Sequence, residues 1–295
     1  MRGGVAEPAH AKINLSLRVP GRRDDGYHEL QSLVVFAGIC DRLTAEASDE
    51  LTLGLTGPFG DILAGEADNL VLRAARALCD AAGVTAGAKL TLEKNLPVAS
   101  GIGGGSADAA AALRALMRLW DVALEEEALA ALAVSLGADV PVCLDTAPAL
   151  MTGLGEGIVR LPALPPFWLV LANPGRALST ASVFRELAAP PLDSEPEVGA
   201  LPAFATLDGL AAWLRGQEND LEAPAIRLVP EIGEAIAALA ATVECRLARM
   251  SGSGATCFGI YAREAEARAA GRILAAAHPD WWIEASPAIG VSGSG

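Results

Sequence analysis

The sequence has little positive charge for its length. Of its 295 residues, 22 are lysine or arginine and 36 are aspartate or glutamate, which gives a formal net charge of −14 at pH 7. Proteins that bind nucleic acids normally carry a basic face, so this composition argues against a nucleic-acid partner. An anionic small molecule would have to be held by local dipoles and a few cations.

Side chains that bind zinc are also scarce. The chain has three histidines and five cysteines, and no two cysteines show CxxC spacing. An odd number of cysteines without such spacing is typical of reduced thiols in the cytoplasm. No apolar run approaches the roughly 20 residues that a membrane-spanning helix needs, and the first residues do not form an apolar signal region. We therefore expect a cytoplasmic protein with no membrane partner.

A cluster of glycines is the most informative feature that is present. Four of the five residues from Gly101 to Gly105 are glycine. Alternating residues at 90–92 predict a strand before this loop, and apolar residues at helical spacing predict a helix over 109–120 after it, with Ser106 as its cap. Such an arrangement directs backbone N–H groups and the positive end of a helix dipole at one place. The loop therefore predicts a phosphate site. A tight structural turn is the alternative, which four clustered glycines disfavour.

The two common phosphate-binding patterns do not fit this loop. The Walker A pattern requires a lysine after the glycines, and none follows here. The dinucleotide pattern requires a third glycine where Ser106 stands, and Asp121, at the right distance for its acidic residue, falls at a helix end instead of a strand end. A nicotinamide-dependent reductase is therefore disfavoured.

The rest of the chain predicts an α+β protein with mixed or antiparallel sheets layered with helices. Strict alternation over 11–19 predicts a strand with one buried face and with Lys12 and Asn14 together on the other face. The proline-rich stretch 162–166 marks a boundary between two domains, 1–162 and 163–295. Other strands are predicted at 33–36, 42–46, 51–55, 149–152, 158–161, 167–171, 257–261 and 281–284, and other helices at 69–82 (capped by Asp68), 125–136, 180–188, 207–215, 230–241 and 263–277.

Read together, five stretches resemble a known superfamily. Residues 97–109 read PVASGIGGGSADA, which resembles the second motif of the GHMP kinases, the superfamily of galactokinase, homoserine kinase and mevalonate kinase. Four further stretches narrow the resemblance: AKINL at 11–15, GYHEL at 26–30, GADVP at 137–141 and MSGSG at 250–254. They are similar to the branch that uses ATP to phosphorylate the 2-hydroxyl of a cytidylated methylerythritol in the non-mevalonate isoprenoid pathway. The resemblance implies a two-domain GHMP kinase fold, with the ATP loop and the catalytic residues in the N-terminal domain and a C-terminal domain that completes the substrate cleft.

The resemblance also implies roles for two catalytic residues. Asp139 would accept or orient the proton of the attacking hydroxyl, and Lys12 would lie near it and support the developing charge. Without the resemblance, an aspartate at a helix end and a lysine on a solvated strand face would be the ordinary interpretations.

The same resemblance implies the binding residues. Tyr27, His28 and Phe184 would contact the cytidine, with core packing as the alternative for Tyr27 and Phe184. Asn14 and Thr180 would contact the remainder of the acceptor, and the turn at 252–254 either closes the site or is only a tight turn. The ATP-binding residues would be Pro97, Val98, Ala99, Ser100, Gly101, Ile102, Gly103, Gly104, Gly105, Ser106 and Ala107.

ATP chemistry implies Mg²⁺, because its charge neutralises the phosphates. The sequence shows no acidic cluster of metal-ligand type, so the metal ligands stay unknown, with Ser106 as one candidate. The partner is a small molecule that carries a cytidine diphosphate, and both a monomer and a homodimer remain open. Two other functions stay open as well: another GHMP kinase of the homoserine or mevalonate type, and a non-catalytic nucleotide-binding protein on the same scaffold.

Overall fold

The computed structural model describes residues 4–63, 65, 68–194, 196 and 201–291. The chain forms two compact units, each assembled from separate segments of the sequence. The first unit takes its described residues from Met1–Ala11, Cys40–Val98 and Gly103–Asp145, and the second from Lys12–Ile39, Ala99–Ile102 and Thr146–Gly295. These units do not coincide with the continuous domains 1–162 and 163–295, and that division of the sequence stays a prediction.

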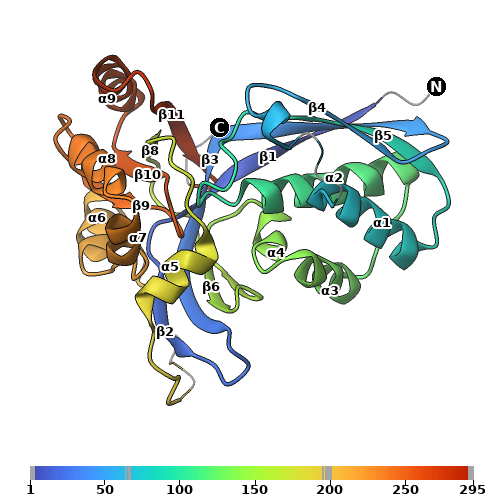
Figure 1. The fold of residues 1–295 in the computed structure, drawn as a ribbon, viewed down its shortest axis with the longest axis horizontal. Coiled ribbons are helices and arrows are strands. Elements are labelled where there is room, and N and C mark those ends of the chain that lie inside the picture. Colours follow the sequence, from blue (N-terminus) through green and yellow to red (C-terminus); the bar gives the residue numbers. More distant parts are fainter. Residues whose placement is uncertain (1–3, 64, 66–67, 195, 197–200, 292–295) are drawn as a thin grey trace. The chain divides into compact units, whose positions relative to one another are not determined.

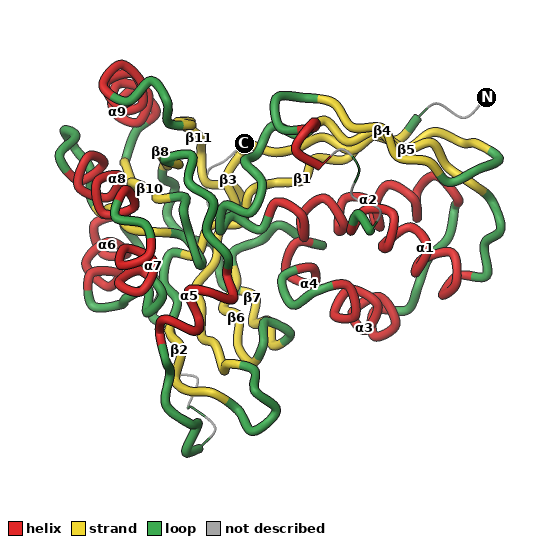
Figure 2. The backbone as a smooth tube through the Cα atoms, in the orientation of Figure 1, coloured by secondary structure: helices red, strands yellow, loops and turns green. Residues whose placement is uncertain are grey.

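In the first unit, helices pack on one side of a small sheet (Figures 1 and 2). Strand β4 runs parallel to β5, and β5 pairs antiparallel with the second half of β3, with Arg42 opposite Glu93. The alanine-rich face of α2 is buried, which lets α1 and α4 pack closely against it. The elements are β1 (Val5–Asn14, which begins here), β3 (His28–Ser48), β4 (Thr52–Thr56), η1 (Gly60–Leu63), α1 (Leu70–Ala82), β5 (Gly87–Glu93), α2 (Gly104–Trp120), α3 (Glu126–Leu136) and α4 (Val140–Cys143).

The second unit is a layered α+β structure in which every strand pair with a described register is antiparallel. The first half of β3 pairs with β2, β6 and β11, and β11 continues into β8, β10 and β9. Helices α8 and α9 bury their apolar faces against these last strands. The elements are β2 (Arg18–Arg22), β6 (Ala149–Gly153), β7 (Gly157–Arg160), β8 (Trp168–Asn173), α5 (Thr180–Leu187), α6 (Leu207–Arg215), α7 (Glu222–Leu228), α8 (Glu231–Ala240), β9 (Leu247–Met250), β10 (Cys257–Tyr261), α9 (Glu264–Ala277) and β11 (Trp282–Ile289).

Most predicted elements are confirmed to within a few residues, including α6 and β10. The strand predicted at 11–19 is wrong in two ways. It is interrupted after Asn14 and resumes at Arg18, and all residues of 11–17 are buried, so neither face meets solvent. The strands predicted at 33–36 and 42–46 are one strand, because Gly38 remains extended within β3. The short elements α4, α7 and β9 were not predicted.

Two helix starts also differ from the prediction. Helix α1 is capped by Asn69, whose side chain accepts a hydrogen bond from the Val71 N–H, so Asp68 lies one residue too early. Helix α2 begins at Gly104, because Gly103 adopts a left-handed conformation that ends the loop there. Ser106 therefore lies inside the first turn and is not the cap.

Candidate active site

The glycine loop leads into α2 without any side-chain cap. Gly103 is the N-cap residue, with φ of 64°, and no side chain caps the helix. The first N–H groups of a helix have no partner within the helix, so this end offers donors to a ligand. A Cβ on Gly105 would meet no atom within 4 Å, which leaves open space beside the first turn. This geometry supports the predicted phosphate site.

The segment of the loop that belongs to the second unit is held by its carbonyl groups. Three consecutive carbonyls accept hydrogen bonds from distant segments: Ser100 from Thr256 N at 3.1 Å, Gly101 from Ser251 Oγ at 3.1 Å, and Ile102 from Lys12 N at 2.9 Å. At Gly101, which has φ of 76°, a Cβ would lie 2.6 Å from Gly254 N and from Ser251 O. The close approach of the turn at 250–254 thus requires glycine in the loop.

Lys12 and Asn14 lie beside this segment in the second unit. Lys12 is 4% exposed, so the alternative of a solvated lysine is wrong. The Asn14 N–H donates to Ser251 Oγ, and Asn14 Nδ2 donates to Ser32 Oγ at 2.7 Å. Asn14 Oδ1 is buried and has no hydrogen-bond partner among the described residues. A buried acceptor of this kind is free to accept a hydrogen bond from a ligand.

Asp139 belongs to the first unit. As predicted, it follows the helix that ends at Gly137, and it is half-buried at the N-cap position of the short helix α4. Its side chain makes no capping hydrogen bond, so it is not an ordinary capping aspartate. Its catalytic role stays a prediction.

Two of the three residues expected to contact cytidine, His28 and Phe184, lie side by side. The rings of His28 and Phe184 lie 4.7 Å apart at an angle of 33°. Burial and the nearby Arg22 lower the pKa of His28, so its ring is neutral at pH 7. Tyr27 is 63% exposed, which excludes core packing, whereas Phe184 rests partly against the core of the second unit. These rings can offer a stacking face and a polar edge to a base.

Thr180 begins helix α5, and its hydroxyl lies 2.8 Å from the Ser253 hydroxyl. Thr180 is exposed and Ser253 is half-buried, so both hydroxyls can also bind a ligand. The turn at 250–254 thus contacts both Thr180 and the glycine loop, which makes it more than a simple connection between strands.

The first unit contains a buried group of charges that the sequence does not predict. The Lys94 ammonium, at the end of β5, bonds Asp41 and lies 2.7 Å from Asp108 of α2. The other oxygen of Asp41 accepts the N–H groups of Asn95 and Leu96, which lead into the glycine loop. Strand β3 runs antiparallel to β5 with Arg42 opposite Glu93, and this register places Asp41 beside Lys94. No spacing in the sequence carries that information.

Burial and charge oppose each other in this group. Burial disfavours the charge on Lys94, but the two carboxylates outweigh it and raise the pKa of Lys94. Burial, with a smaller contribution from Asp41, raises the pKa of Asp108 to about 8 despite the attraction of Lys94. Asp108 Oδ1 has no hydrogen-bond partner among the described residues. Burial therefore favours the neutral form of Asp108, whereas the attraction of Lys94 favours its charged form.

No described residues form a group of three or more histidine, cysteine or acidic side chains able to hold a metal ion. The hydroxyl of Ser106, in the first turn of α2, is an oxygen donor of the kind that Mg²⁺ accepts. All five cysteines are free thiols. In the described part of the chain, no helix combines the length and apolar character needed to cross a membrane.

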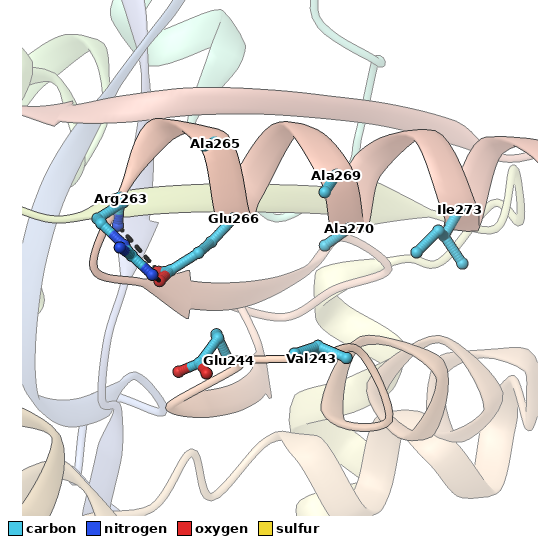
Figure 3. A pocket seen from close by; sticks show the side chains of 8 residues that line it. All are labelled: Val243, Glu244, Arg263, Ala265, Glu266, Ala269, Ala270 and Ile273. Carbon is cyan, nitrogen blue, oxygen red and sulfur yellow. Dashed lines mark hydrogen bonds and ion pairs between the residues drawn. The ribbon is translucent and has the colours of Figure 1, made fainter.

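A pocket of about 350 Å³ lies elsewhere in the second unit, between α9 and the turn that follows α8 (Figure 3). Val243 and Ile273 form its apolar walls, and both side chains are exposed. The ion pair between Arg263 and Glu266 lies at one end, where it completes the capping box of α9. None of the predicted site residues lines this pocket, so it is not part of the candidate active site.

Comparison with known proteins finds matches along nearly the whole chain. Residues 69–153 match the model of the GHMP kinase N-terminal domain, and residues 199–280 match that of the GHMP kinase C-terminal domain. The 4-diphosphocytidyl-2-C-methyl-D-erythritol kinase of Parvibaculum lavamentivorans is 64% identical over 98% of this chain and 100% of its own length.

Solved structures show the same likeness. A crystal structure of 4-(cytidine 5'-diphospho)-2C-methyl-D-erythritol kinase is 39% identical, with a TM-score of 0.76 over 96% of this chain and 98% of its own. A homoserine kinase from Cytophaga hutchinsonii is 18% identical, with a TM-score of 0.69 over 97% of this chain and 95% of its own. The second likeness shows a shared fold alone.

Replacing Asp108 with asparagine tests the buried charge group. Because its pKa is raised to about 8 in the folded protein and is about 4 in an unfolded chain, the folded state binds the extra proton between these values. The stability that this proton provides is complete below pH 4 and is lost as the pH rises through 8. The free energy of unfolding of the wild type, relative to Asp108→Asn, should therefore fall by at least ~1 kcal/mol between pH 5 and pH 9.

Urea unfolding at pH 5, 7 and 9 measures this difference. Asp121→Asn, at the exposed other end of α2, controls for the removal of one carboxylate from this helix. If the difference in the free energy of unfolding between the wild type and Asp108→Asn is the same at all three pH values, Asp108 is ionised over this whole range.

Proposed function

Since the chain belongs to the GHMP kinase family, we propose that it is an ATP-dependent kinase that phosphorylates the 2-hydroxyl of 4-diphosphocytidyl-2-C-methyl-D-erythritol, a step of the non-mevalonate isoprenoid pathway. The observation that carries this proposal is the 64% identity with a kinase of that name over almost the full length of both chains. The motifs that distinguish this branch from other members lie within the matched length.

The other functions considered are less well supported. The solved homoserine kinase is 18% identical to this chain, far below the identity with the cytidylated-substrate kinases. The paired rings of His28 and Phe184 favour an acceptor that carries a base, because an aliphatic amino alcohol has no ring to stack on them. A non-catalytic nucleotide-binding protein would not account for the 64% identity with a kinase over almost the full length of both chains.

We assign ATP to the glycine loop. The uncapped N-terminus of α2 would donate its first N–H groups to the phosphates, and its dipole would favour their negative charge. The open space beside Gly105 leaves room for this approach. Mg²⁺ bound with ATP supplies positive charge that neutralises the phosphates, and Ser106 in the first turn of α2 is our candidate for a hydroxyl contact to it.

In the reaction, the acceptor hydroxyl oxygen forms a bond to the γ-phosphorus of ATP while the bond to the departing ADP oxygen breaks. We propose that Asp139 accepts the hydroxyl proton, since it lies in the GADVP stretch that resembles the family's motif and a carboxylate can act as a general base. Lys12 would place a positive charge where negative charge develops on the transferred group. Catalysis of phosphoryl transfer rests mainly on such positioning and charge.

The acceptor would bind to side chains of the second unit. Tyr27, with its exposed ring, and the pair of His28 and Phe184 would hold the cytosine. Thr180 and the unpartnered Asn14 Oδ1 would contact the diphosphate or the methylerythritol part. We also expect the enzyme to act in the cytoplasm, where its free thiols stay reduced.

A direct comparison of acceptors tests the proposed reaction. Release of ADP is measured with the cytidylated methylerythritol, mevalonate and homoserine in parallel at equal ATP. We expect kcat/KM for the cytidylated alcohol to exceed that for the other two by at least ~10³-fold, because each lacks the base that the aromatic rings would hold. Faster turnover of mevalonate or homoserine would overturn the assigned substrate.

Replacing Asp139 tests the proposed base. The variant Asp139→Asn keeps the shape of the side chain but cannot take a proton, so kcat should fall by at least ~10²-fold with little change in KM. Single-turnover kinetics separates this step from product release. The matched control is Asp145→Asn, an exposed aspartate just after α4, which should retain the wild-type kcat. A normal kcat for Asp139→Asn would show that another group accepts the proton.

Replacing Tyr27 tests the cytidine contact. Loss of the ring in Tyr27→Ala should raise KM for the cytidylated alcohol by ~10-fold and leave KM for ATP unchanged, because stacking on a base contributes about 1–3 kcal/mol. Tyr27→Phe keeps the ring and should behave as the wild type does. Equal KM values for Tyr27→Ala and the wild type would remove Tyr27 from the binding site.

A further inference from the structure

Ser251 is the centre of a small hydrogen-bond network in the second unit. Its hydroxyl accepts the Asn14 N–H and donates to the Gly101 carbonyl, each at 3.1 Å. Ser251 is fully buried, so a displaced hydroxyl would find no water in place of these partners. One side chain thus contacts both the loop assigned to ATP and a residue assigned to the acceptor.

Asn219 holds the backbone on both sides of Ser251. Its Nδ2 donates to the Met250 carbonyl and to the Gly252 carbonyl, each at 2.9 Å. These are the carbonyls of the two residues next to Ser251. A side-chain amide has two N–H donors, and here both serve this one turn.

Asn219 is itself held firmly. It is 6% exposed, and its Oδ1 accepts the Leu221 N–H at 3.0 Å. Its neighbours in the chain pair with the segment after β1, because Glu218 O accepts the Leu17 N–H and the Asp220 N–H donates to Leu17 O. The amide therefore has a fixed position from which to set the turn.

The turn has no room to compensate for an error in its position. A Cβ on Gly252 would lie 2.7 Å from Gly101 O and 3.2 Å from Asn14 Oδ1. A small movement of the turn would therefore change its contacts with Gly101 and Asn14 together. Misplacing reacting groups by about 1 Å can cost an enzyme ~10²-fold in rate.

From these contacts we infer that Asn219 is a positioning residue for phosphoryl transfer, which acts through the Ser251 turn on both the ATP loop and the acceptor side. The inference rests on the proposed roles of Gly101 and Asn14. Asn219 itself would contact neither ATP nor the acceptor. Its effect should therefore depend on Ser251.

A double-mutant cycle between Asn219 and Ser251 tests this dependence. Asn219→Asp keeps the oxygen that accepts the Leu221 N–H and replaces both donors by an oxygen that repels the two carbonyls. Ser251→Ala removes the hydroxyl. Each single variant should lower kcat/KM by ~10-fold or more and raise KM for both ATP and the acceptor. The double variant should be worse than the more damaging single variant by less than ~3-fold, because both changes break one chain of contacts.

Turnover by the wild type is measured first, so a failure of the proposed reaction is recognised before the cycle is interpreted. The control for lost stability is Tyr261→Phe, which removes a partly buried hydrogen bond to Thr242 in the same unit. It should lower the melting temperature and leave both KM values unchanged. If Asn219→Asp does not fold, Asn219→Ser, with one donor and an acceptor for Leu221, replaces it.

Two results would overturn the inference. Additive losses in the double variant would show that Asn219 acts independently of Ser251 and has only a structural role. An unchanged kcat/KM in Ser251→Ala would show that the Ser251 hydroxyl does not position the ATP loop or Asn14, so Asn219 could not act through it.

Discussion

The glycine loop depends on hydrogen bonds to its carbonyl oxygens. Each of three consecutive carbonyls accepts a hydrogen bond from a donor that is distant in the sequence: those of Ser100, Gly101 and Ile102. Because these acceptors are occupied, the conformation of the loop is fixed by the fold rather than by a ligand. The backbone N–H groups at the end of a loop fixed in this way need no rearrangement when negative charge develops on a bound phosphate. This is the property that electrostatic catalysis requires.

The approach to the loop from β5 has a second anchor of another kind. Asp41 accepts two backbone N–H groups and the ammonium of Lys94, so a buried charge holds the chain just before the glycines. The same ammonium lies 3.1 Å from where a Cβ of Gly104 would be. Removing one member of such a buried group leaves its partner without compensation, whereas an exposed pair contributes little. The glycine loop is thus held by hydrogen bonds to its backbone carbonyls, and the segment before it is held by buried charges.

The sequence predicts the fold class, the family and most of the elements, because periodicity and glycine patterns are local signals. It does not predict the partners of Ser251 or Asn219, since these depend on tertiary contacts such as that between Asn219 and Gly252. The strand around Lys12 was predicted with one exposed face, because alternation reveals the polarity of residues and not what later covers them. Ser106 was predicted as a cap because serine favours that position, but the left-handed Gly103 decides where the helix begins.

The segmented composition of the second unit has a consequence for synthesis. Residues 12–39 are synthesised before all other segments of this unit, yet Ala37 of β3 pairs with Ala288 of β11, which is synthesised after them. This part of β3 therefore cannot complete its pairing until β11 has been synthesised. Such long-range pairing slows folding and leaves strands open to aggregation. The sheet of the second unit can therefore form completely only after its widely separated segments have all been synthesised.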